Sequence, residues 1–73
     1  MEQLLDMLKR TFPLIDFDTE TQLMTKGLLD SLAVVDIIAN LEDMFDISVT
    51  MEYIQPANFE SAAAMWAMVE ELQ

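Results

Sequence analysis

Asp30 and Ser31 are the two residues whose types and order point most directly to chemistry. They stand in the segment 27–32, GLLDSL, where a loop gives way to a helical pattern of apolar residues. If the Asp30 carboxylate caps that helix, it leaves the Ser31 hydroxyl uncommitted. A phosphodiester on this hydroxyl would lie beside free N–H groups at the positive end of the helix dipole. The pair therefore predicts a helix start that suits a permanent phosphate, although Asp-Ser is also a common capping pattern.

Catalysis by the chain itself has little support in its composition. The sequence has no Cys and no His, which removes thiolate and imidazole metal ligands, the Cys nucleophile and the usual general base. At 73 residues the chain lies near the lower size limit for a self-supporting core, so a deep catalytic cleft is not expected. We therefore expect one domain over residues 1–73 that is not an enzyme and holds no metal.

The excess of acidic residues limits the kinds of molecule that this protein is expected to bind. Fourteen acidic residues stand against three basic ones, which gives a formal net charge of −11. Such a surface repels nucleic-acid phosphates and anionic lipid headgroups, and the apolar run 62–69 is too short to span a bilayer. The N-terminal segment lacks the basic start and long apolar stretch of a signal peptide. We expect a monomeric, cytoplasmic protein that binds basic proteins. We expect it neither to bind nucleic acid nor to insert into membranes.

Three stretches have the periodicity of amphipathic helices, which predicts an all-α fold. The first runs from Glu2 to Phe12 and ends at Pro13, and the clearest runs from Ser31 to Phe45. The third follows Ser61, its predicted N-cap. The predicted inward-facing residues of these helices are Leu4, Leu5, Leu8 and Phe12; Val34, Val35, Ile38, Leu41 and Phe45; and Ala62, Met65, Trp66, Val69 and Leu72.

The connections between these helices differ in length and character. Residues 14–29 have no sustained period and predict a long ordered loop anchored by Ile15, Phe17, Leu23 and Leu28. Residues 45–50, FDISVT, alternate too briefly for a sheet and predict a connector. Residues 52–54 predict one helical turn, which Pro56 should end.

The segment GLLDSL resembles the attachment motif of the acyl carrier protein family, G-x-x-Asp-Ser-Leu. The resemblance continues at 41–49, LEDMFDISV, and at 57–61, ANFES, and covers nearly the whole chain. It implies a four-helix bundle of three main helices and one short helix. It also implies that a phosphopantetheinyl transferase attaches 4′-phosphopantetheine from coenzyme A to Ser31, directly after Asp30. The chain would then carry an acyl or aminoacyl group as a thioester, with Ser31 as a substrate and not a catalyst.

The same resemblance implies that the helix after Ser31 presents the arm to loading ligases and synthases with basic docking patches. Leu32, Asp36, Glu42 and Asp43 fall at positions that family members use for docking. Ala33 departs from the Asp-Ser-Leu-Asp typical of carriers in fatty acid synthesis. GLLDS also resembles D-alanyl carriers and carriers of polyketide or nonribosomal peptide systems, so the pathway and the cargo stay open.

Two other interpretations compete with a carrier. Residues 16–20, DFDTE, alternate acidic side chains as a calcium-binding EF-hand loop does, but Thr21 and Gly27 occupy the places that need Gly and Glu. A specific calcium loop is therefore not expected. The second is an unmodified acidic adaptor that binds partner helices through an apolar groove, with Ser31 acting only as a cap.

Overall fold

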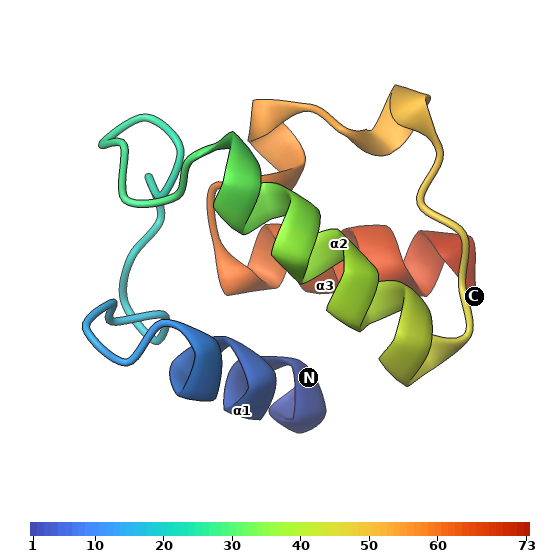
Figure 1. The fold of residues 1–73 in the computed structure, drawn as a ribbon, viewed down its shortest axis with the longest axis horizontal. Helices are drawn as coiled ribbons and strands as arrows, with labels where there is room; N and C mark the ends of the chain where they lie inside the picture. Colours follow the sequence, from blue (N-terminus) through green and yellow to red (C-terminus); the bar gives the residue numbers. More distant parts are fainter.

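The computed structural model describes all 73 residues, and helices and loops account for the whole chain (Figure 1). The elements are α1 (Glu2–Thr11), α2 (Ser31–Phe45), the 3₁₀ helices η1 (Met51–Tyr53) and η2 (Pro56–Phe59), and α3 (Ala62–Leu72). The predicted all-α class, long loop and connector are confirmed, with two short 3₁₀ helices where one short helix was expected. None of these helices combines the length and hydropathy that a bilayer span requires.

Local signals set the ends of the main helices. In α1, Glu2 lies in the first turn and Lys9 and Arg10 in the last, which complements the helix dipole. Helix α2 ends at Asp46, whose left-handed backbone (φ 53°, ψ 50°) stops the helix. Helix α3 begins after Ser61, whose hydroxyl accepts a 3.0 Å hydrogen bond from the Ala64 amide, as predicted.

The turn η1 ends before Pro56, as predicted, but Pro56 is also the first residue of a second short helix, η2, which was not predicted. A proline suits this position, since the first amide of a helix has no intrahelical acceptor and the proline φ is already helical. The residue before it, Gln55, is extended (φ −129°, ψ 146°), as the proline ring requires. The interruption between η1 and η2 therefore lies one residue before the proline.

The buried face of α2 agrees with the predicted one in part. Val34 and Leu41 are buried as predicted, and Ile38 and Phe45 are partly buried against the core. Ile37, which was not predicted, is buried, whereas Val35 is 61% exposed. Apolar residues occupy both 34–35 and 37–38, so the packing of α1 against α2 decides which of them faces inward. In the long loop, the predicted anchor Leu28 is exposed, and its neighbour Leu29 is buried instead.

Helix α3 contributes Ala62, Met65, Met68 and Val69 to the core. Met68 was not predicted, and Trp66 is only half-buried. The Trp66 ring meets the Phe45 ring edge-on with 5.6 Å between centroids, so the indole packs against the end of α2 rather than inside the core.

Helix α1 contacts both α2 and α3, and η2 packs against α3. The long loop between α1 and α2 crosses one end of the molecule, at the left of Figure 1, and delivers the chain to Ser31. Residues that begin α2 and residues of η2 line one common pocket beside Ser31. This arrangement positions the candidate site.

Candidate functional site

Asp30 caps α2 as the sequence predicted. Its Oδ1 accepts a 2.8 Å hydrogen bond from the Ala33 amide, and its backbone is extended (φ −103°, ψ −177°). Ser31, the first residue of the helix, is exposed, and its hydroxyl takes part in none of the side-chain hydrogen bonds of the structure. The amides of Ser31 and Leu32 lie in the first helical turn, where no intrahelical acceptor exists. The site therefore offers a free hydroxyl beside N–H groups that suit an anion.

The four predicted docking residues do not share one environment. Leu32, at 77% exposure, and the exposed Asp36 and Asp43 present their side chains to solvent along α2. Glu42 is half-buried, and its Oε2 accepts a 2.9 Å hydrogen bond from the Val49 amide. Glu42 thus has a structural contact that the sequence did not predict.

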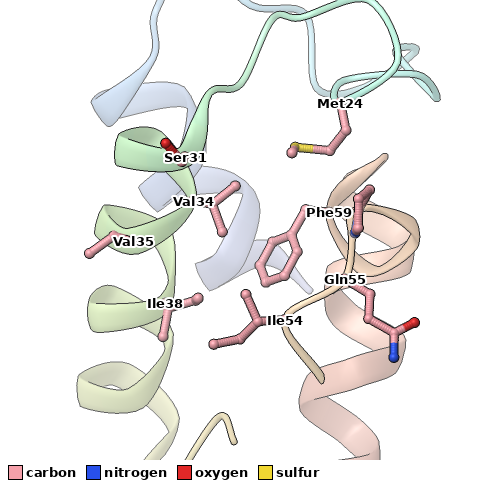
Figure 2. A pocket seen from close by; sticks show the side chains of 9 residues that line it. Met24, Ser31, Val34, Val35, Ile38, Ile54, Gln55 and Phe59 are labelled. Atoms are coloured by element: carbon pink, nitrogen blue, oxygen red, sulfur yellow. The ribbon is translucent and has the colours of Figure 1, made fainter. Parts of the chain in front are cut away.

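An apolar pocket of about 250 Å³ opens beside Ser31 (Figure 2). Side chains of α2 form one wall, and the opposite wall comes from η2, the segment before it and the long loop. The lining residues are Met24, Ser31, Val34, Val35, Ile38, Ile54, Gln55, Pro56 and Phe59. Six of these nine residues are hydrophobic, so the pocket suits an apolar group.

The wall opposite α2 is held by its own contacts. The Phe59 ring is almost fully buried and points toward α2, while Ile54 points toward Ile38 (Figure 2). The Asn58 side-chain amide donates to the Tyr53 carbonyl at 2.7 Å and so joins η2 to η1. Sequence periodicity did not reveal this pocket, because its walls come from three separate segments.

Carboxylates in the long loop accept hydrogen bonds from the loop itself. Asp16 accepts from the Thr19 hydroxyl at 2.7 Å and from the Asp18 amide at 3.2 Å, and these hydrogen bonds lower the pKa of Asp16. The Glu20 carboxylate accepts from the amides of Gln22 and Thr21, which together with Lys26 lower the pKa of Glu20. No cluster of three acidic side chains able to hold a metal ion forms.

Comparison with known proteins adds one significant relative. No protein-family model matches the chain, and no solved structure matches it at a significant level. A curated protein described as the probable acyl carrier protein PigG, from Serratia sp. (strain ATCC 39006), is 34% identical to this chain over 56 residues. These residues make up 77% of this chain and 64% of the relative, so the match spans less than two thirds of the relative's length. The chain is therefore similar in sequence to an acyl carrier protein over most of its own length, and the GLLDSL motif and the all-helical fold agree with that similarity.

Proposed function

We propose that this chain is a carrier protein that holds an acyl or aminoacyl group as a thioester on a 4′-phosphopantetheine arm attached to Ser31. The observation that carries the proposal is the exposed, unbonded Ser31 hydroxyl at the start of α2, directly beside an apolar pocket. Ser31 is the acceptor of the group, which comes from coenzyme A through a phosphopantetheinyl transferase. The arm, when attached, supplies the thiol that forms the thioester.

The residues around Ser31 fit a phosphodiester. Free amides at the start of α2 face this position, and the helix dipole favours a negative charge there by about 0.3–1 kcal/mol. Asp30 is the one carboxylate adjacent in sequence, and its Oδ1 is already engaged by the Ala33 amide. The first turn of α2 contains no acidic residue of its own. The negative charge of the phosphodiester therefore adds little repulsion from the helix that would hold it.

The pocket favours a cargo with an apolar chain. Its wall residues are mainly Val, Ile, Met and Phe side chains, with Gln55 and Ser31 as the polar members. An aminoacyl ammonium placed among these side chains would find no carboxylate partner, and burying an unpaired charge is strongly unfavourable. Among the pathways that the motif leaves open, we favour those that load fatty acyl or polyketide chains over D-alanylation.

The partners of a carrier with this charge are basic proteins. With a net charge of −11, the chain attracts basic patches on a transferase, a loading ligase or a synthase by long-range steering. Exposed Leu32, Asp36 and Asp43 on α2, the helix that begins at Ser31, provide an apolar contact flanked by negative charges. We propose that this face meets those enzymes, with the chain acting as a monomer in the cytoplasm.

Intact-protein mass spectrometry tests the proposal. The folded chain is incubated with coenzyme A and a promiscuous phosphopantetheinyl transferase, and then weighed. We expect the wild type to gain one phosphopantetheinyl group and Ser31→Ala to gain none. The matched variant Ser48→Ala removes another exposed serine hydroxyl and should gain the group normally. No gain in the folded wild type would overturn the carrier function and leave the unmodified acidic adaptor as the better account.

A further inference from the structure

Glu60, at the end of η2, is bound by three consecutive residues of the long loop. The Leu23 amide donates to the Glu60 carbonyl at 2.9 Å. The amides of Met24 and Thr25 both donate to Glu60 Oε1, at 2.7 and 2.9 Å, and the Thr25 hydroxyl donates to Oε2. These contacts join segments that are more than thirty residues apart in sequence.

The hydrogen bonds of this contact suit a carboxylate. Successive backbone amides that point to one side form a concavity that binds an anion, and Glu60 supplies the anion from another element. Hydrogen bonds from Thr25, through its hydroxyl and its amide, and from the Met24 amide lower the pKa of Glu60. At neutral pH the carboxylate is therefore charged, and its hydrogen bonds are of the strong, charge-assisted kind.

Glu60 connects two of the segments that form the pocket wall opposite α2. Its neighbour Phe59 points into the pocket from η2, and Met24 lines it from the long loop (Figure 2). Glu60 does not line the pocket, so any effect on the cavity passes through the residues that it holds. The Leu23 carbonyl accepts from the amides of Leu28 and Leu29, at 2.9 and 3.2 Å, which extends the connection toward Ser31.

We propose that Glu60 is a positioning residue whose carboxylate fixes Met24 and Thr25 against η2, so that Met24 is held in the pocket wall that encloses the cargo beside Ser31. This inference rests on the proposed carrier function, because it assigns cargo enclosure to that pocket. In a chain whose residue 60 has no side-chain acceptor, Met24 and Thr25 would lose their hydrogen bonds to that side chain, and Met24 would move away from Phe59. The Leu23 amide would keep its bond to the backbone carbonyl of residue 60.

Hydrogen exchange in the unmodified protein tests the first step. In Glu60→Ala we expect the protection of the Met24 and Thr25 amides to fall by about tenfold, with the helix amides still protected. Glu60→Gln keeps an acceptor for both amides and gains a donor for the Thr25 hydroxyl, so it should retain most of the protection. Glu70→Ala removes the same charge from an exposed position on α3 and should change neither amide. Equal protection in Glu60→Ala and Glu70→Ala would overturn the inference.

Methyl NMR of the loaded protein tests the second step. The arm on Ser31 is loaded with octanoate or, as a matched short cargo, with acetate. In the wild type and in Glu60→Gln we expect octanoate to shift the Met24 methyl signal relative to acetate. In Glu60→Ala we expect this difference to be lost, while the Ile37 methyl signal in the core stays at its wild-type position. Retention of the octanoate shift in Glu60→Ala would show that Glu60 does not position the pocket wall.

The two proposals fail separately. If the wild type gains no phosphopantetheinyl group, the proposed carrier function is wrong. The hydrogen-exchange rates of the unmodified chain still decide whether the Glu60 side chain binds Met24 and Thr25. If the wild type loads normally but octanoate shifts Met24 equally in all variants, the carrier function stands and the positioning role of Glu60 is wrong.

Discussion

The Glu42 carboxylate accepts a hydrogen bond from the Val49 amide at 2.9 Å, across the turn that follows α2. Val49 is buried, so the bond fixes the connector where it enters the core. The family resemblance assigned Glu42 to docking together with Asp36 and Asp43. The structure gives Glu42 an internal partner, while Asp43, the next residue, is exposed and makes no such bond.

Glu42→Ala should therefore lower stability more than Asp43→Ala does. Removing the acceptor leaves the part-buried Val49 amide without a partner, which lowers the free energy of unfolding by about 1–2 kcal/mol. Asp43→Ala changes an exposed side chain and should stay within about 0.5 kcal/mol of the wild type. Urea denaturation followed by circular dichroism measures both. Equal stabilities of the two variants would show that the Glu42 bond contributes nothing in solution.

Truncation of Ile37 should lower the free energy of unfolding far more than truncation of Val35. Ile37 is fully buried and Val35 is 61% exposed, although the two lie two residues apart on α2. Ile37→Ala should lower the free energy of unfolding by about 2–5 kcal/mol through lost burial and a new cavity. Val35→Ala should change it by less than about 0.5 kcal/mol. The same denaturation experiment measures both, and a larger loss in Val35→Ala would restore the face that periodicity predicted.

This contrast shows what the sequence can and cannot predict here. The bounds of α2 and the caps at Asp30 and Ser61 were predictable because a cap is a local signal. The exact buried face of α2 was not predictable from the sequence. Adjacent apolar residues on α2 are all able to face the core, and tertiary packing decides which of them do. The pocket and the Glu60 contact were also beyond prediction, because each joins segments with no local pattern in common.

The contribution of Glu60 to stability should depend on pH in one direction. Hydrogen bonds from Thr25 and Met24 lower the pKa of Glu60 below its ordinary value of 4.5. A carboxylate whose pKa is lower in the folded state stabilises the fold above the unfolded pKa, and this stability is lost as pH falls through the folded pKa. The difference in unfolding free energy between the wild type and Glu60→Gln should therefore be constant from neutral pH to about pH 5 and shrink below it.

Urea denaturation at a series of pH values measures this difference. Protonation of the other carboxylates relieves repulsion in both proteins, so subtracting one from the other isolates Glu60. Glu70→Gln, which neutralises an exposed carboxylate of α3, serves as the control and should show no such change. A difference that persists unchanged at a pH well below 4.5 would contradict the lowered pKa of Glu60.

Asp36 and Asp43 should guide the transferase to Ser31, because both carboxylates are exposed on the helix that begins at Ser31. Replacing both with Lys reverses the local charge that would attract a basic transferase. At low salt we expect modification of Ser31 to slow by about tenfold, since steering by complementary charge raises association rates by this order or more. Added salt should shrink the difference from the wild type, because exposed charges are screened over about 10 Å at 0.1 M ionic strength.

A second double variant separates local docking from total charge. Glu2→Lys with Glu70→Lys makes the same net change on α1 and α3, at exposed positions away from the α2 face. Initial rates from intact mass, with helicity checked by circular dichroism, compare the three proteins. We expect the α2 pair to slow modification more than the α1 and α3 pair at every salt concentration where a difference remains. Equal slowing would mean that overall charge governs the encounter, and no slowing in either would show that carboxylates of α2 do not guide the transferase to Ser31.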